Sequence, residues 1–135
     1  MAGALKRVSG FLKEYEDQNL FARHEQAIQR NIESLHWSGE HQVYCDASID
    51  NRTHVLVCHK GYISLFPFLV GLIAPNHTHL GAVLHLIRDE NELWSPNGVR
   101  SLSKTDRYYG TYENYWRSPV WININYMILE QLLVS

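Results

Sequence analysis

Two tryptophans and an arginine lie close together in the segment from Tyr115 to Leu133 of this 135-residue chain. Trp116 and Trp121 offer indole faces, which pack against apolar C–H groups, and Arg117 offers a planar fork of N–H donors. A ligand with apolar ring faces and many hydroxyl groups suits this combination, as a sugar does. The alternative is a buried tryptophan pair that caps a hydrophobic helix, and the segment alone leaves both interpretations open.

The same segment carries the signals of a helix start. Ser118 suits the N-cap, and Pro119 suits the first helical position because its φ is already helical and its missing N–H is not needed there. The apolar residues that follow predict a helix from Pro119 nearly to the C-terminus. Trp116 and Arg117 then lie on the loop before the helix, and Trp121 lies in its first turn.

Three sequence blocks resemble glycoside hydrolase family 63. They occur in the family's order, and the resemblance covers the chain from about Cys45 onward. The residues before it resemble the family only in being helical and amphipathic. Ser118 is a departure, because the family usually has glycine there, and the added side chain bears on substrate fit. The blocks are GYISLFPFLVGLI (61–73), ELWSPNGVRSLSK (92–104) and YWRSPVWININY (115–126).

The resemblance implies an activity, a substrate and a location. The expected activity is an exo-glucosidase that removes the outermost α-1,2-linked glucose from the triglucosylated N-glycan precursor, with inversion and without metal or cofactor. The expected partners are this oligosaccharide and the remainder of the catalytic domain. The resemblance also implies the lumen of the endoplasmic reticulum, although the chain shows no targeting signal.

The resemblance also implies substrate-binding residues. Trp116 and Trp121 are expected to form aromatic walls around the terminal glucose, and Arg117 to donate to hydroxyls or orient a carboxylate. Arg100 is a further polar candidate, for which the alternative is a salt bridge that pins its loop. Tyr115 could contact the ligand or simply pack, and Glu113 is the only carboxylate among the aromatic loop residues.

No catalytic residue is expected in this chain. Inverting hydrolysis uses two carboxyl groups ~6.5–9.5 Å apart, one as general acid and one as general base. The resemblance places the acid in a serine-glycine-x-aspartate segment and the base in a glutamate followed closely by tyrosine, and neither motif occurs here. We therefore expect the chain alone to be inactive. Two alternatives remain: a non-catalytic carbohydrate-binding or scaffold fragment, and an (α/α)6 glycosidase that acts on a small glucoside.

Apolar residues recur at helical spacing along much of the chain, which predicts helices joined in pairs. The segment 42–60 loses this period and predicts a short hairpin or two crossing loops. Residues 94–117 predict a long loop of the kind that is usually functional. The expected helices cover 5–15, 20–35 after a break at 17–19, 64–74, a segment from Thr78 or His79, and a segment from Pro119.

These elements predict an all-α fold with a short extended or loop segment near residues 42–60. The resemblance implies a partial (α/α)6 toroid made of αα-hairpins. Because five helices cannot complete twelve, residues 1–135 are expected to be a fragment of a single (α/α)6 glycosidase catalytic domain.

Charge and hydropathy exclude two classes of partner. The net charge is −2 and no basic cluster is longer than Lys6–Arg7, so nothing favours nucleic acid. The longest apolar run, Tyr62 to Ala74, is too short to span a bilayer, so we expect no membrane contact by this segment.

Cys45 and Cys58, which are the two cysteines, could pair in an oxidising compartment, but their spacing alone does not decide it. A zinc site would have to add His41 and His59 to them, and adjacent ligands at 58 and 59 are awkward, so no metal is expected. Two acceptor motifs for N-glycans, Asn51-Arg52-Thr53 and Asn76-His77-Thr78, weakly favour a lumenal protein.

Overall fold

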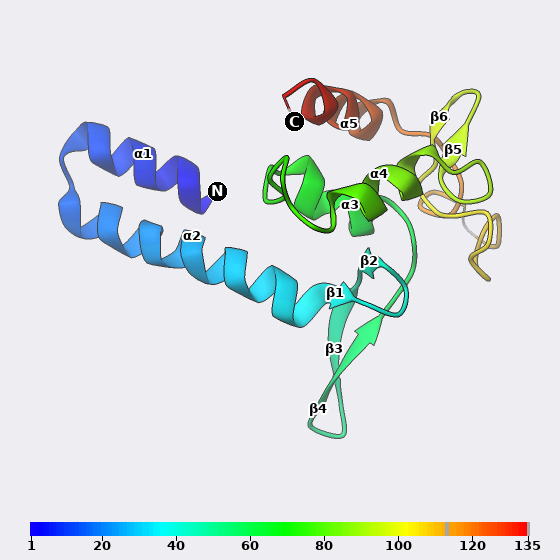
Figure 1. The fold of residues 1–135 in the computed structure, drawn as a ribbon, viewed down its shortest axis with the longest axis horizontal. Helices are drawn as coiled ribbons and strands as arrows, with labels where there is room; N and C mark the ends of the chain where they lie inside the picture. The colour runs from blue at the N-terminus through cyan, green and yellow to red at the C-terminus, as the bar shows by residue number, and fades with distance from the viewer. Residues whose placement is uncertain (113, 135) are drawn as a thin grey trace. The chain divides into compact units, whose positions relative to one another are not determined.

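The computed structural model describes residues 1–112 and 114–134, which form two compact units, Met1–Leu35 and His36–Ser135. The described residues contain five α-helices and three two-stranded antiparallel sheets (Figure 1). The predicted all-α class, with its partial (α/α)6 toroid, is therefore wrong, and the fold is mixed α and β. Four of the six strands contain two residues each, which is too short to leave an alternating pattern in the sequence.

The first unit is the predicted helical hairpin. Helix α1 covers Ala2–Leu12 and α2 covers Tyr15–His36. The predicted break at 17–19 is wrong, because the chain turns at Lys13, whose left-handed φ of 62° lets its N–H bond to Gly10 O. The acidic residues after that turn, including Asp17, instead lie in the first turn of α2, where they complement the helix dipole.

The second unit begins with strands β1 (Trp37–Ser38) and β2 (Val43–Tyr44), and a longer hairpin follows. Strand β3 (Asp46–Asp50) pairs with β4 (Thr53–Val57), which confirms the hairpin alternative for residues 42–60. A disulfide joins Cys45 to Cys58 at the base of this hairpin. Both sulfurs are thereby used, so the considered zinc set loses its thiolate ligands.

Helix α3 (Tyr62–Leu69) begins two residues earlier than predicted and ends well before residue 74. Its N-cap is Gly61, where a Cβ would lie 2.5 Å from the carbonyl oxygen of Ser101, so only glycine allows this approach. Pro67 lies beyond the first turn of the helix, contrary to prediction. Gly71, with φ of 71°, follows the helix end and lets the chain leave it.

Helix α4 covers Leu80–Arg88 with His79 as its N-cap, so it begins one residue after the later of the two predicted starts, Thr78 and His79. The segment 94–117 that follows is irregular except for the short pair β5 (Trp94–Ser95) and β6 (Gly98–Val99). The core of this unit contains apolar side chains from several of its elements, each with no more than 2% exposure. They are Val43 and Tyr44 from β2, Tyr62, Leu65 and Phe68 from α3, Val83 from α4, and Leu93 just before β5.

Helix α5 covers Ile122–Val134, so the predicted start at Pro119 is wrong by three residues. Val120 instead forms an antiparallel bridge with Arg100, and Pro119 O accepts a hydrogen bond from Ser101 N. The chain is thus held extended against residues 100–101 before it can coil. A sequence-based N-cap rule cannot foresee this, because the competing partner lies about twenty positions earlier.

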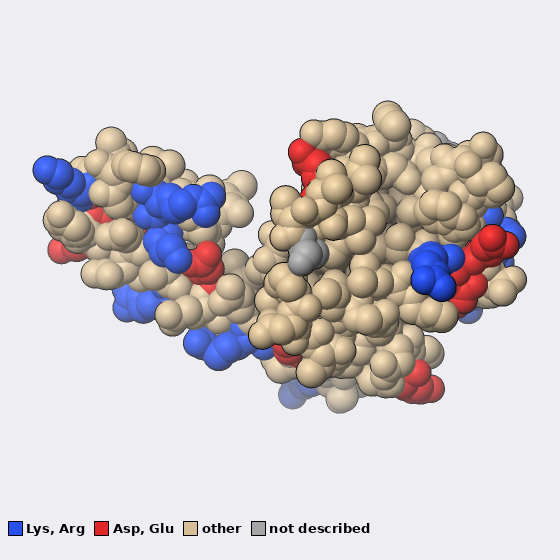
Figure 2. All heavy atoms as spheres, turned by 45° about the horizontal axis from the view of Figure 1, so that its top comes forward, with Lys and Arg blue, Asp and Glu red and all other residues tan. Residues whose placement is uncertain are grey.

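Charged side chains of both signs are scattered over the described residues, and the face of the second unit in Figure 2 is mostly uncharged. None of the helices in the described part of the chain is long and apolar enough to cross a membrane.

Candidate functional site

Three aromatic rings meet just before α5. The Trp116 and Trp121 ring centroids lie 4.1 Å apart, and Tyr115 lies 4.7 Å from Trp121 and 6.2 Å from Trp116. Trp121 Nε1 donates to Tyr115 O at 3.2 Å, which closes the group. Tyr115 is 62% exposed and Trp116 is 47% exposed. We call these three residues the aromatic cluster, and it presents indole surface that the chain's own core does not cover.

Tyr62, in the first turn of α3, fixes the position of Trp121. Its hydroxyl accepts the Trp121 backbone N–H at 2.9 Å and donates to Val99 O at 2.6 Å. Burial raises the pKa of Tyr62, although hydrogen bonds from Trp121 and Asn125 act in the opposite direction. The hydroxyl therefore remains protonated and can serve as a donor and an acceptor at once.

Asn125, one turn into α5, completes this connection. Its Oδ1 accepts Val99 N–H at 2.7 Å, and its Nδ2 lies 3.0 Å from both Val99 O and the Tyr62 hydroxyl. The side-chain amide thus pairs with Val99 as a neighbouring strand would. It connects α5 to β6 and to α3, and these three joined elements hold the segment that carries the aromatic cluster.

A cavity of about 240 Å³ opens beside Trp116. It is smaller than the ~300–1,000 Å³ typical of drug-sized ligands, so its size suits a single sugar ring. Its polar lining residues include Asp46 and His59, and its apolar wall includes Tyr62 and Trp116. The remaining lining residues are Gly61, Ile63, Ser101 and Leu102.

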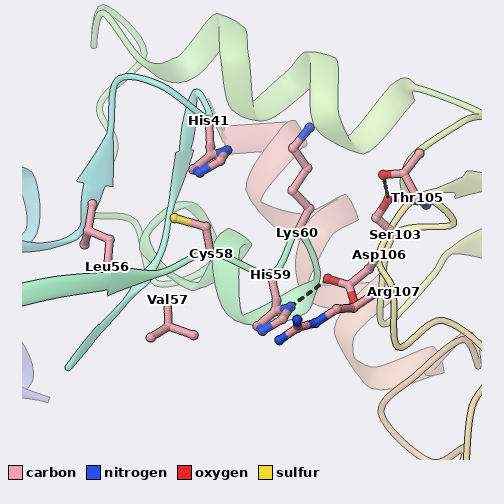
Figure 3. Close-up of a pocket in the computed structure, with 10 residues that line it drawn as sticks. All are labelled: His41, Leu56, Val57, Cys58, His59, Lys60, Ser103, Thr105, Asp106 and Arg107. Carbon is pink, nitrogen blue, oxygen red and sulfur yellow. Dashed lines mark hydrogen bonds and ion pairs between the residues drawn. The ribbon is translucent and has the colours of Figure 1, made fainter. Parts of the chain in front are cut away.

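His59 also lines a second, larger cavity of about 490 Å³, which Figure 3 shows. His59 Nδ1 lies 2.7 Å from Asp106 Oδ2, and this carboxylate holds the imidazole ring in place. Lys60 and Arg107 add cationic groups to the lining, and Thr105 adds a hydroxyl. The two cavities share His59 as a lining residue. The smaller cavity has an aromatic wall, and the larger one has mainly polar and charged groups.

Glu92 binds three residues that line the larger cavity. Lys60 Nζ lies 2.5 Å from Glu92 Oε1, and the hydroxyls of Ser103 and Thr105 donate to Glu92 Oε2. Burial pushes the pKa of Glu92 upward, but these three hydrogen bonds and the Lys60 charge outweigh it and lower the pKa below its ordinary value. Glu92 is therefore ionised and already bound, which makes it a support for the loop 92–105.

The profile of the C-terminal domain of glycosyl hydrolase family 63 matches residues 1–134. The chain belongs to this family. A probable mannosyl-oligosaccharide glucosidase of Schizosaccharomyces pombe is 52% identical over 130 residues, which cover 96% of this chain and 16% of that protein. The mannosyl-oligosaccharide glucosidase of Saccharomyces cerevisiae is 40% identical over 135 residues, which cover 98% of this chain and 16% of that protein.

A plant relative, the mannosyl-oligosaccharide glucosidase GCS1 of Arabidopsis thaliana, is 44% identical over 82 residues, or 57% of this chain and 10% of that protein. The predicted resemblance to family 63 is confirmed, and it extends through the N-terminal helices. The chain spans about 16% of the length of the two yeast relatives.

The family 63 residues predicted to bind sugar do not all lie together. Tyr115, Trp116 and Trp121 form the aromatic cluster. Arg117 turns toward its own loop, where Nη1 donates to Thr111 O at 3.2 Å and its guanidinium lies 5.4 Å from the Tyr108 ring centroid. In this geometry Arg117 holds the loop, and its predicted contact with a ligand stays a prediction.

Arg100 lies elsewhere. It is 8% exposed, and its Nη1 donates to the backbone carbonyls of Trp94, Glu92 and Glu90. Arg100 thus pins its loop, as in the alternative interpretation, but among the described residues it does so through backbone carbonyls and not through a salt bridge. Glu113 lies outside the described residues.

Sequence reasoning gave no substrate role to four residues around the cluster. They differ in the signal that could have revealed them. His59 lies two residues before the family block 61–73 and Tyr62 lies inside it, so their proximity to a motif was a usable hint. Asn125 lies inside the family block 115–126 and so carried the same hint, whereas Asp46 carried none, because it lies in an exposed strand outside the three blocks.

Proposed function

We propose that this chain forms a sugar-binding part of the catalytic domain of a family 63 glucosidase. The proposed reaction removes the terminal α-1,2-linked glucose from the triglucosylated N-glycan precursor by inverting hydrolysis. The names of the two yeast relatives, both mannosyl-oligosaccharide glucosidases, support a glucosylated oligosaccharide as the substrate.

The observation that carries the proposal is the position of Trp116. Its indole contacts Trp121 on one side, is 47% exposed and lines the 240 Å³ cavity. A sugar ring presents axial C–H groups that pack on such a face, while its hydroxyls point outward in the ring plane. Trp116 thus supplies the wall of the glucose subsite, and Trp121 keeps that wall in place.

Polar groups around the cavity then select the orientation of the ring. The Asp46 carboxylate accepts hydrogen bonds from sugar hydroxyls, which are strengthened by its charge. His59 is oriented by Asp106 and faces both cavities, so it contacts the glucose or the sugar next to it. The larger cavity gives room for the part of the oligosaccharide that is not released.

The catalytic acid and base are proposed to come from other segments of the complete enzyme. Inversion needs two carboxyl groups that face each other across the glycosidic bond. In this chain Asp106 is bound to His59 and Glu92 to Lys60, so both carboxylates are committed to holding side chains. The role of these residues in catalysis is to bind and orient the substrate, which contributes by placing the scissile bond correctly.

We further propose that the enzyme works in the lumen of the endoplasmic reticulum. The disulfide between Cys45 and Cys58 supports an oxidising compartment, because such bonds rarely persist in the cytosol.

Product analysis of the complete enzyme tests this proposal. The enzyme is incubated with the triglucosylated oligosaccharide, and with the diglucosylated one whose terminal linkage is not α-1,2. Proton NMR then identifies the first anomer of glucose released. We expect β-glucose from the triglucosylated substrate and almost none from the other. Release of α-glucose, or equal rates on both substrates, would contradict the proposal.

A further inference from the structure

The N-glycan acceptor motif Asn51-Arg52-Thr53 forms the tip of the β3–β4 hairpin. Asp50 pairs with Thr53, and Asn51 and Arg52 make the two-residue turn with positive φ values of 46° and 65°. This is the geometry of a type I′ turn, in which asparagine is favoured at the first central position. The acceptor asparagine thus occupies the outermost point of a regular hairpin.

The surroundings of Asn51 leave space for a large group. All five residues of β3 are exposed, as are Asn51, Arg52, Thr53 and His54. Within the part of the chain that the structure describes, the Asn51 amide makes no hydrogen bond. In Figure 1 the hairpin projects away from α3 and α4 of its own unit. A glycan on Asn51 therefore displaces no packed side chain.

The base of the same hairpin supplies an independent observation. Cys45 and Cys58 flank the last strand pair, Asp46 with Val57, and are joined by a disulfide. Disulfides form in the secretory pathway, which is also where N-glycans are attached to asparagine in this motif. One short segment thus combines an exposed acceptor with a bond that requires the matching compartment.

The second motif, Asn76-His77-Thr78, is placed differently. It lies in the connection between α3 and α4, where His77 N–H bonds to Ala74 O at 2.9 Å. His77 Nδ1 also accepts His79 N–H at 3.1 Å, and the two rings contact each other edge to face at 5.1 Å. Asn76 and Thr78 are exposed, but the middle residue His77 is half-buried and held by these contacts, whereas the middle residue Arg52 of the first motif is exposed.

We propose that Asn51 carries an N-linked oligosaccharide and that Asn76 does not. The donor is an oligosaccharide linked to a membrane lipid through pyrophosphate. Asn51 Nδ2 forms a bond to C1 of the first sugar, the bond from C1 to the pyrophosphate oxygen breaks, and the lipid pyrophosphate leaves with the electron pair. One amide proton passes to a base of the transferase. The Thr53 hydroxyl is the recognition element two residues on.

The glycan has a physical consequence for the hairpin. The β3–β4 sheet has two strands, so each has an outer edge without a strand partner among the described residues. Ile49, next to the turn, is 78% exposed. A large hydrophilic group at the tip keeps other chains from pairing with these edges.

Mass spectrometry of the complete protein, expressed in a eukaryotic secretory pathway, tests the proposal. Peptides are released by protease, and an amidase removes glycans in heavy-oxygen water, which labels each former acceptor as aspartate. We expect the label at Asn51 in most molecules and its absence at Asn76. An unlabelled Asn51 in folded protein, or a label confined to Asn76, would overturn the proposal.

Matched variants distinguish the motif from the fold. Thr53→Ala and Asn51→Gln are expected to raise the gel mobility by one glycan, and Thr53→Ser to leave it unchanged, because serine keeps the hydroxyl. If Thr53→Ala migrates like the unaltered protein, Asn51 is not the acceptor. The readout does not use glucosidase activity, so an inactive protein that carries the glycan would refute the proposed function alone.

Discussion

The Tyr62 hydroxyl lies 3.0 Å from Asn125 Nδ2, and this contact joins the first turns of α3 and α5 across 63 positions of sequence. The same hydroxyl accepts the Trp121 N–H and donates to Val99 O. The buried hydroxyl of Tyr62 thus connects the family blocks 61–73 and 115–126, and this connection positions the aromatic cluster. The placement of this hydroxyl explains why Trp121 is held at a fixed position just before α5.

Replacement of Tyr62 tests this dependence. Tyr62→Phe keeps the ring but leaves Trp121 N–H without its acceptor, which costs ~1–3 kcal/mol for a buried donor. Val99 O loses the phenol donor and keeps only the Asn125 amide. We expect a clearly lower midpoint of thermal unfolding in the complete protein. Tyr126→Phe is the control, because that side chain is 57% exposed and its hydroxyl contacts Glu130. Equal melting of the two variants would contradict the role of Tyr62.

Glu92 predicts a dependence of stability on pH. Its pKa is lowered in the folded protein, so it stabilises the fold above the unfolded pKa of ~4.3 and loses that contribution as pH falls through the folded value. Glu92→Gln is therefore expected to lower stability at neutral pH and to flatten its decline in acid. Denaturation curves at several pH values measure this, with the exposed Glu90→Gln as the control. A Glu92→Gln profile parallel to the unaltered one would refute the assignment.

Replacement of Arg100 tests whether this residue holds its loop or binds substrate. Its guanidinium satisfies backbone carbonyls of the turn 90–94 and is 8% exposed. We expect Arg100→Lys to destabilise the complete protein by about 1–3 kcal/mol, while KM for the oligosaccharide stays within about twofold at temperatures where the variant is folded. The exposed Arg88→Lys serves as the control. A large rise in KM with unchanged stability would instead support the predicted ligand contact.

Replacement of Asp46 tests whether this residue binds substrate or acts as a catalytic acid or base. In the proposed function Asp46 accepts hydrogen bonds from sugar hydroxyls in the 240 Å³ cavity. We therefore expect Asp46→Asn to raise KM several-fold and to leave kcat nearly unchanged. Loss of a catalytic acid or base costs about 10²–10⁴ in rate. Initial rates over a range of substrate concentrations decide between them. Asp50→Asn, an exposed change in the same strand, is the control, and a loss of that size in kcat would make Asp46 a catalytic residue.

The sequence predicted those parts of the molecule that depend on local patterns or on family blocks. The helical hairpin, the start of α4 within one residue of His79 and the irregular segment 94–117 are local in this sense. The family was recognised because GYISLFP and YWRSPVW keep their residue types and order. The proximity of Trp116 to Trp121 followed from their spacing of five positions around a helix start.

What the sequence did not predict depends on partners far apart in the chain. The start of α5 is delayed because Val120 bridges to Arg100, and the contact between His59 and Asp106 spans 47 positions. For the β3–β4 hairpin the sequence allows two alternatives, because an exposed strand such as β3 has no buried face to create an alternating pattern of apolar and polar residues. The strands of two residues were missed, which is why the fold class was wrong.

The most direct test of the account is the activity of Trp116→Ala in the complete enzyme, measured beside Trp94→Ala. The two tryptophans are 47% and 40% exposed, but only Trp116 lines the 240 Å³ cavity. We expect kcat/KM on the triglucosylated oligosaccharide to fall at least about tenfold for Trp116→Ala, or ~1.4 kcal/mol, with similar melting temperatures for both variants. Trp94→Ala should keep nearly full activity. Equal activity of the two variants, or a loss in Trp116→Ala explained by unfolding, would contradict the claim that the aromatic cluster binds glucose.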